Sequence, residues 1–201
     1  MNALVAASAV SFAVIFVAEL GDKSQLMALT FATRFKALPV LVGITLATAV
    51  VHGVSVGLGY LLGAAVPTFW ISIAAAVAFL AFGLWTLRGD ALSDDDRARA
   101  SATTRGAVVA AGVAFFLAEL GDKTMLATIT LATQYPGAGG VAGVWFGSTV
   151  GMVVADALAI VVGRALGRNL PDTAIRIGAA VLFFAFGIWL AVEALLSRGI
   201  L

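Results

Sequence analysis

One stretch of this sequence occurs twice, and the repetition limits the folds that the chain can adopt. Residues 16–33 read FVAELGDKSQLMALTFAT and residues 116–133 read FLAELGDKTMLATITLAT, so eleven of these 18 positions are identical. The correspondence continues downstream at the same offset of 100, for example from Gly63 to Gly163, and then shifts to 104 through a short insertion. Two copies of one unit therefore make up nearly the whole chain.

The composition identifies the solvent of these units as lipid. Hydrophobic residues make up 62% of the 201 positions and charged residues only 11%, which is more apolar surface than a soluble domain of this size buries. Apolar runs and helix breakers predict six transmembrane helices, over about 4–33, 40–64, 69–88, 106–133, 140–166 and 173–196. We therefore expect an all-α membrane protein with a single membrane domain, residues 1–201.

Three helices in each unit have a consequence for the topology. Because three is odd, the second unit must enter the membrane from the side opposite to the first. The sequence thus predicts two inverted three-helix repeats, repeat one over 4–88 and repeat two over 106–197, joined by a linker over 89–105. Secondary transporters with this symmetry bind their substrates near the bilayer midplane, where the repeats meet.

The basic residues predict the orientation. Nine of them follow the first, third and fifth predicted helices, whereas only Arg198 falls on the opposite side. Cytoplasmic loops carry the excess of Lys and Arg, so we expect a cytoplasmic linker and both termini outside. The nine residues are Arg34, Lys36, Arg88, Arg97, Arg99, Arg105, Arg164, Arg168 and Arg176.

Six charged residues fall inside predicted helices and need a reason, because each costs about 2.5–3.5 kcal/mol at the centre of a bilayer. They are Glu19, Asp22, Lys23, Glu119, Asp122 and Lys123. In a continuous helix, each Glu and Lys stand at i, i+4, where a local ion pair forms, and Gly21 faces the other way and allows another helix to approach. That pairing is the structural interpretation, with Lys23 and Lys123 holding the acids in place.

Local pairing leaves Asp22 and Asp122, and hence a formal charge of −2, without compensation. A divalent cation, protons, or both would neutralise it. The predicted metal ligands are Glu19, Asp22, Glu119 and Asp122, with the side-chain oxygens of Ser24, Thr124 and Gln25; oxygen ligands suit Mn²⁺, Ca²⁺ or Mg²⁺. Clustered carboxylates also hold protons tightly, so protons and metal would compete for one site, as antiport requires.

Two further polar residues break the repeat. Asp156 corresponds to Val56, and His52 corresponds to Met152. Either residue is a candidate for relaying protons or for lining one half of a pathway, and His52 is equally a candidate for a hydrogen-bonded structural histidine.

The doubled E-x-G-D-K-[ST] motif, at 19–24 and 119–124, resembles that of the GDT-type cation antiporters, related to the lysine-exporter superfamily. The resemblance covers essentially the whole chain and includes GMVVADALAI at 151–160. It implies export of Mn²⁺, or Ca²⁺, from the cytoplasm in exchange for protons, through the motif acids. The chain lacks the N-terminal extension of eukaryotic members, so the resemblance also implies a bacterial inner membrane.

The same residues argue against several other functions. An exporter of amino acids or another small organic solute would bring a carboxylate into a site that is already negative. An intramembrane aspartyl protease needs a Tyr-Asp partner pattern that the sequence lacks, and GDKS and GDKT lack the glycines of a P-loop. A scaffold would not need two charged motifs. We expect no enzyme activity, no cofactor and no nucleic-acid partner; the lipid bilayer, metal and protons are the expected partners, and homo-oligomerisation is left open.

Overall fold

The computed structural model describes residues 2–88, 106–166 and 172–198, and these residues form eight helices and no strand. In a bilayer an isolated helix satisfies its own backbone groups, which explains why such an apolar chain is helical. The all-helical class is therefore confirmed, whereas the predicted linker over 89–105 lies outside the described residues. The helices are α1 (Ala3–Glu19), α2 (Lys23–Arg34), α3 (Ala37–Ala65), α4 (Thr68–Arg88), α6 (Ala107–Glu119), α7 (Lys123–Gln134), α8 (Gly137–Leu166) and α9 (Asp172–Ser197).

The prediction of continuous helices over 4–33 and 106–133 is wrong. The chain leaves the helical conformation after Glu19 and resumes it at Lys23, with a bend of 75° between α1 and α2. The equivalent segment in the second repeat is broken between α6 and α7. The cause is a glycine in each motif, because Gly21 has φ +76° and Gly121 has φ +78°, a left-handed conformation that ends a right-handed helix.

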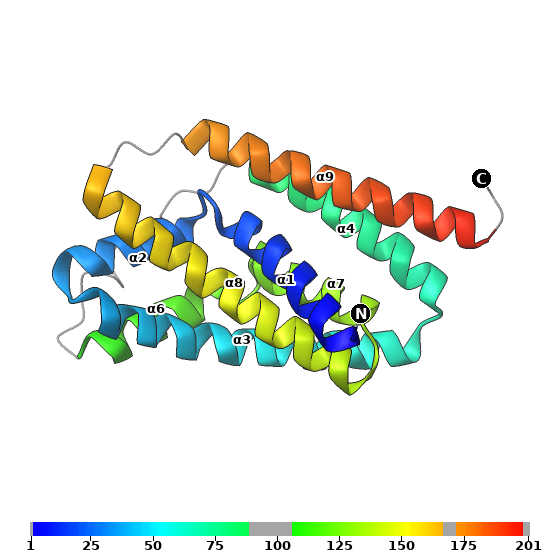
Figure 1. The fold of residues 1–201 in the computed structure, drawn as a ribbon, viewed down its shortest axis with the longest axis horizontal. Coiled ribbons are helices and arrows are strands. Elements are labelled where there is room, and N and C mark those ends of the chain that lie inside the picture. Colours follow the sequence, from blue (N-terminus) through cyan, green and yellow to red (C-terminus); the bar gives the residue numbers. More distant parts are fainter. Residues whose placement is uncertain (1, 89–105, 167–171, 199–201) are drawn as a thin grey trace.

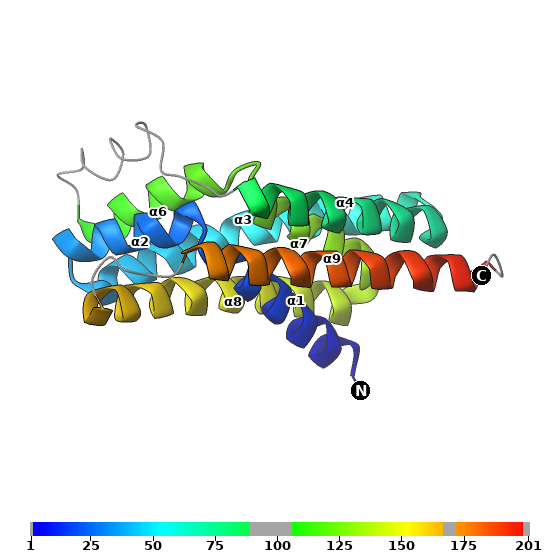
Figure 2. The ribbon, with the colours of Figure 1, turned by 90° about the horizontal axis from the view of Figure 1, so that it is seen from above.

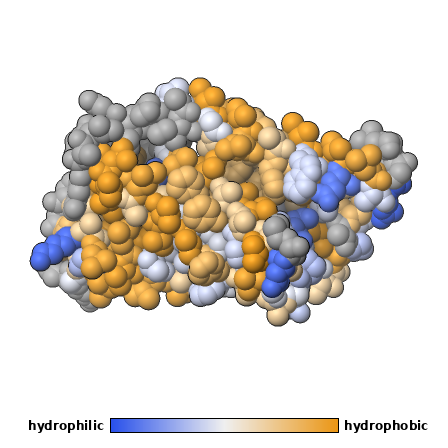
Figure 3. Space-filling view, viewed as in Figure 1, coloured by the Kyte–Doolittle hydropathy of each residue, from blue (hydrophilic) through white to orange (hydrophobic). Residues whose placement is uncertain are grey.

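In the described part of the chain, four helices are long and apolar enough to cross a membrane on their own, namely α3, α4, α8 and α9. The bent pair α1 and α2 is a fifth candidate span if it is counted as one, and α6 is apolar but shorter. With a rise of about 1.5 Å per residue, the 29 residues of α3 exceed the ~30 Å of a hydrocarbon core. Hydrophobic side chains cover the middle of the visible face, as Figure 3 shows, with hydrophilic residues toward its ends.

The helices of the two sequence repeats pack against each other. Helix α1 of the first repeat lies on α8 of the second, α6 of the second lies on α3 of the first, and α4 lies beside α9. The long helices run roughly along one direction, whereas α1 crosses α8 at an angle (Figures 1 and 2). A cluster of aromatic rings joins α4 to α9, contributed by Phe79, Phe82, Phe183 and Phe186. Each half of the sequence thus completes its core with helices from the other half.

Glycines allow the crossed pairs to approach closely. A methyl group at Gly143 of α8 would lie 2.5 Å from the carbonyl oxygen of Leu4 and 2.8 Å from Cβ of Ala7 on α1. A methyl group at Gly43 of α3 would lie 2.5 Å from the carbonyl oxygen of Val108 on α6. All three distances are far below van der Waals contact, so the two equivalent glycines set the spacing of the two equivalent helix pairs.

Gly143→Ala is expected to lower the thermal midpoint of the purified protein in detergent. Overpacking a tight contact costs about 1–3 kcal/mol, and about 2–4 °C is lost per kcal/mol in a chain of this length. Gly57→Ala is the matched control, because a methyl group there meets nothing within 4 Å. Equal midpoints for the two variants would show that the α1–α8 contact is looser than described.

Candidate metal-binding site

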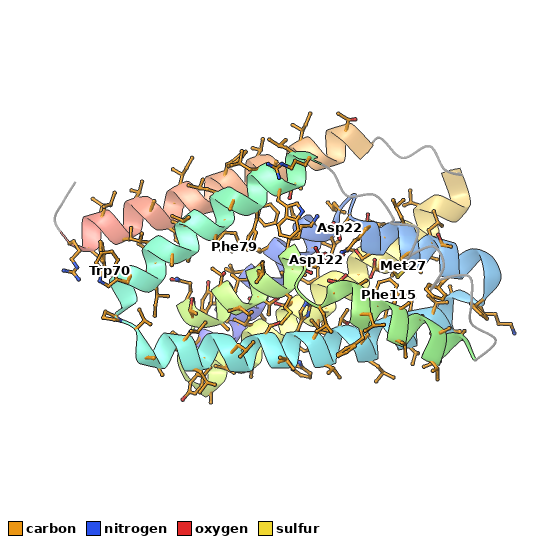
Figure 4. All side chains as sticks on the ribbon, turned by 180° about the vertical axis from the view of Figure 1, so that it is seen from behind. Asp22, Met27, Trp70, Phe79, Phe115 and Asp122 are labelled. Carbon is orange, nitrogen blue, oxygen red and sulfur yellow. The ribbon has the colours of Figure 1, made fainter. Side chains whose placement is uncertain are left out.

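The two helix breaks place the two motifs next to each other in the centre of the protein. Asp22 precedes the first residue of α2 and Asp122 precedes the first residue of α7, and their side chains lie close together in Figure 4. Glu19 and Glu119 end α1 and α6. All four carboxyl groups are buried. The carbonyl ends of α1 and α6 face the same breaks and carry partial negative charge, which favours a cation.

The lysines pair with aspartates across the repeats. Nζ of Lys123 donates to Oδ1 of Asp22 in a short contact, and Nζ of Lys23 lies 3.7 Å from Oδ1 of Asp122. The expectation that a continuous helix leaves both aspartates uncompensated is therefore wrong, because the bend ends the i, i+4 geometry on which it rested. At the equivalent glycine of the second motif, Gly121, no atom of the described residues lies within 4 Å of an added methyl group.

The predicted hydroxyl ligands hold the glutamates. Ser24 Oγ donates to Oε2 of Glu19 in a short hydrogen bond and lies 3.3 Å from Oδ2 of Asp22. Thr124 Oγ1 donates to Oε2 of Glu119 at 2.6 Å. The equivalent hydroxyls of the two repeats thus fix one oxygen of each glutamate and leave the other available. Both hydroxyls keep lone pairs, which a cation would accept as further ligands.

The Gln25 side chain connects the first break to α8. Its Oε1 accepts a hydrogen bond from the backbone N–H of Gly21 at 2.9 Å, and its Nε2 donates to the carbonyl oxygen of Ala155 at 3.1 Å. Met125 is the equivalent residue in repeat two, and its Sδ lies 3.2 Å from the backbone nitrogen of Gly121. Gln25 is predicted to be a metal ligand, and in the structure its side chain also connects the helix break to α8.

Three carboxyl groups have the spacing of a cation site. One oxygen from each of Glu19, Asp22 and Glu119 lies within 4.8 Å of the other two. Oxygens that surround one ion at about 2.3–2.6 Å stand up to ~5 Å apart, so this spacing suits a divalent ion. Oε1 of Glu19 and Oε1 of Glu119 are buried without a hydrogen-bond partner among the described residues, as is Oδ2 of Asp122. Buried carboxylate oxygens in this state are poised to accept a cation or a proton.

The two asymmetric residues lie at different places. Asp156 is fully buried on α8, and neither of its oxygens has a hydrogen-bond partner among the described residues. It follows Ala155, whose carbonyl oxygen accepts a hydrogen bond from Gln25, so it lies near the first helix break. The structure thus places Asp156 close to the acidic cluster. His52 is buried on α3, and its Nδ1 lies 3.4 Å from Oγ1 of Thr149.

The positive-φ glycines are the functional residues that the sequence reasoning missed. The positive φ of Gly21 and Gly121 ends one helix so that the next begins directly after an aspartate. A signal was present, since a glycine followed at once by Asp is typical of a helix end followed by a helix N-cap. Its occurrence in both motifs strengthened that signal.

Comparison with known proteins agrees with the residue pattern. The family described as "Divalent cation/proton antiporter GDT1" matches residues 7–94 and 107–198. A protein of Vibrio cholerae named "Putative manganese exporter" is 35% identical over 176 residues, which cover 87% of this chain and 85% of that protein. GDT1-like protein sll0615 of Synechocystis is 30% identical, over 87% of this chain and 91% of its own length.

A plant relative is longer than this chain. Protein PAM71, chloroplastic, of Arabidopsis thaliana is 33% identical over 88% of this chain but only 54% of its own length. No solved structure matches the chain. The doubled acidic motif, the apolar helices and the family match over both repeats lead to one conclusion: this chain belongs to the GDT1 family of divalent cation/proton antiporters.

Proposed function

We propose that this protein exports Mn²⁺, with Ca²⁺ as the second candidate, from the cytoplasm in exchange for protons. One observation carries the proposal: buried carboxyl oxygens of Glu19, Asp22 and Glu119, drawn from both repeats, lie within 4.8 Å of one another. The proposed ligand set also includes the side-chain oxygens of Asp122, Ser24, Thr124 and Gln25. The related protein from Vibrio cholerae is named as a manganese exporter, which favours Mn²⁺.

The proposed topology has six spans in two inverted repeats, over 4–88 and 106–197. The packing supports it, because α1 on α8 and α6 on α3 are equivalent pairs, while α4 and α9 are equivalent helices that pack on each other. In this topology α1 with α2 forms one broken span and α6 with α7 forms another. Broken helices that meet at the repeat interface are where inverted-repeat transporters bind ions.

The proposed orientation follows from the basic residues and places both termini outside and the linker over 89–105 in the cytoplasm. A multi-pass protein in a bacterial inner membrane fits this arrangement. Export of a divalent cation against a potential of 100 mV costs about 4.6 kcal/mol, at ~2.3 kcal/mol per charge, and the entry of two protons cancels that electrical cost.

Proton coupling is proposed to arise from competition within the acidic cluster. The two motifs hold four carboxyl and two ammonium groups, and Asp156 adds a fifth carboxyl group nearby. Since metal ligands must be deprotonated, Mn²⁺ binding would release protons, and proton binding would release Mn²⁺. Lys23 and Lys123 would then exchange partners as the charge of the cluster changes. Asp156 is the proposed proton relay on α8, and His52 is the second candidate.

Metal flux into proteoliposomes with an imposed pH gradient tests the proposal. Mn²⁺ and Ca²⁺ are compared for the wild type, Asp22→Asn and Asp122→Asn, with the exposed Glu193→Gln as the matched control. Residues that only support metal ligands change affinity about 10–100-fold, so we expect each aspartate variant to lose at least about tenfold in flux and Glu193→Gln to lose none. Monodisperse wild type that carries neither metal would refute the proposal, and lysine flux would then indicate an organic-solute exporter.

A further inference from the structure

Helices α1 and α8 carry the same three kinds of side chain, in the same order, along one buried face. On α1, Ser11, Ile15 and Glu19 stand at i, i+4 and i+8, which places them on one side of the helix. On α8, Ser148, Met152 and Asp156 have the same spacing. All six side chains are fully buried. Each helix therefore carries a hydroxyl, then a large apolar side chain, then a carboxyl group.

The packing of the two helices brings these series into register. A methyl group at Gly147 would lie 2.3 Å from the carbonyl oxygen of Ser8, and one at Gly151 would lie 2.7 Å from that of Phe12. Contacts on α8 thus advance in the same direction as those on α1, so the helices run parallel (Figure 1 shows α1 against α8). It follows that Ser148 lies near the depth of Ser11, and Met152 near that of Ile15.

The carboxyl groups complete the register. Asp156 is one turn beyond Met152, as Glu19 is one turn beyond Ile15, and the hydrogen bond from Gln25 to the carbonyl oxygen of Ala155 joins this level of α8 to the first helix break. Ile15 and Met152 also belong to the same apolar core cluster. Between α1 and α8 there are therefore three layers, which we call the hydroxyl layer (Ser11, Ser148), the apolar layer (Ile15, Met152) and the carboxyl layer (Glu19, Asp156).

The hydroxyl layer has no visible structural explanation. Oγ of Ser11 and Oγ of Ser148 are buried and have no hydrogen-bond partner among the described residues. Other buried hydroxyls donate to the carbonyl one turn earlier, as Ser55 does to Val51 at 2.7 Å and Thr128 does to Thr124 at 2.8 Å, whereas among the described residues the hydroxyls of Ser8 on α1 and Thr86 on α4 also have no partner. A buried hydroxyl without a partner costs about 1–3 kcal/mol, so the two serines of the hydroxyl layer need a ligand such as water or a hydrated ion.

The equivalent helix pair, α3 with α6, differs from α1 with α8 in its buried hydroxyl groups. Thr48 corresponds to Ser148, but its hydroxyl donates to the carbonyl oxygen of Ile44 at 2.8 Å. Phe115, fully buried, stands one turn before Glu119 on α6. No buried hydroxyl without a partner lies on the described residues of α3 and α6. The two halves are therefore chemically different, although the repeats that build them are similar.

From this asymmetry we infer that the α1–α8 interface is the route between the carboxyl layer and the side on which α1 begins, through which the transported ion leaves and water and protons enter. The apolar layer of Ile15 and Met152 is the gate of this route, closed in the conformation described here. Side chains of this size exclude water from a narrow passage and so block ions without a covalent or charged barrier. The exported ion rests on the hydroxyl layer after it has passed the gate. This inference rests on the proposed transport function.

Thiol labelling tests the route directly, because the chain contains no cysteine and a single introduced cysteine is the only target. Ser148→Cys and its repeat equivalent Thr48→Cys are placed in sealed liposomes and treated with a membrane-impermeant methanethiosulfonate reagent, added to each side in turn. Asn2→Cys, at the exposed start of α1, identifies the side of the N-terminus. We expect Ser148→Cys to react from that side at least tenfold faster than Thr48→Cys.

The gate is tested by shortening one of its side chains. Adding Met152→Ala to Ser148→Cys is expected to accelerate labelling from the N-terminal side about tenfold. Met27→Ala is the matched control, since Met27 is equally buried but belongs to the other core cluster, and it should leave the rate unchanged. Equal labelling of Ser148→Cys and Thr48→Cys, or no acceleration by Met152→Ala, would overturn the inference.

Mn²⁺ flux measured on the same liposomes separates this inference from the proposed function. Flux through Ser148→Cys without labelling of its cysteine would refute the route and leave the transport function standing. Labelling as expected, with no metal flux in the wild type, would leave the route standing and refute manganese export.

Discussion

Glu19→Gln is expected to weaken Mn²⁺ binding about 100-fold or more, and Glu119→Gln to do the same. Each substitution keeps the shape of the side chain but removes one of the three carboxyl groups whose oxygens lie within 4.8 Å of one another. The size of the effect follows from a lower bound, because even residues that only orient metal ligands change affinity about 10–100-fold. Isothermal titration of detergent-solubilised protein with Mn²⁺ measures it.

Removing the hydroxyl group of Ser24 or Thr124 is expected to have a smaller effect on Mn²⁺ binding than removing a carboxyl group. Ser24→Ala and Thr124→Ala remove the donors that hold Glu19 and Glu119 but leave every carboxyl group in place. They should weaken binding by about tenfold, the lower end of the range for such partners. Glu193→Gln, on the exposed surface of α9, should leave binding unchanged. Wild-type affinity in both glutamate variants would show that the metal does not bind at the helix breaks.

Lys123→Met is expected to lower the thermal midpoint far more than the equivalent Lys23→Met. The side chain of Lys123 is 3% exposed and pairs with the fully buried Asp22, whereas that of Lys23 is 23% exposed and lies 3.7 Å from Asp122. Removing one partner of a buried pair costs about 3–5 kcal/mol, because the other charge is left uncompensated. At about 2–4 °C per kcal/mol this is a fall of roughly 10 °C.

A double variant separates charge from packing. Asp22→Asn added to Lys123→Met removes the uncompensated carboxylate, so it should restore part of the lost midpoint. Lost packing alone would instead make the two effects add. Equal midpoints for Lys123→Met and Lys23→Met would show that the difference in burial does not matter for stability.

The sequence identified the charged residues of the site but not their partners. Hydropathy correctly predicted that Glu19 and Asp22 lie within an apolar part of the chain, and both are buried in the protein. It failed on the pairing of Lys123 with Asp22, because residues 101 positions apart meet only through the tertiary fold. The assumption of a continuous helix then led to a local pair, which the 75° bend does not support.

Helix breaks were harder to predict than spans for a physical reason. Hydropathy averages over about 20 residues, so three residues such as Leu20, Gly21 and Asp22 barely change it. The left-handed φ of Gly21 is a local property of one residue, and only the Gly-Asp order indicates it. The same averaging explains why α3, α4, α8 and α9 were predicted to within a few residues of their ends.

The asymmetry between the two repeats could be predicted in part from the sequence. Comparison of the repeats showed that Asp156 replaces Val56, and in the structure it directly follows Ala155, which Gln25 contacts from the first helix break. The serines at 11 and 148 carried no such signal, because serine is common in apolar helices and usually bonds to its own backbone. Only the geometry of α1 against α8 shows that these two do not.

Each half of the chain packs on helices of the other half, and this arrangement also determines when folding can finish during synthesis. Helix α1 emerges from the ribosome first, yet the helix it packs on, α8, begins only at Gly137. Asp22 meets the same delay, since Lys123 is made about a hundred residues later. The first half therefore enters the bilayer with an acidic face that has not yet met its basic counterpart, and a chaperone, water or bound protons must shield it. A chain that stalls after its first half would be a clear substrate for membrane quality control.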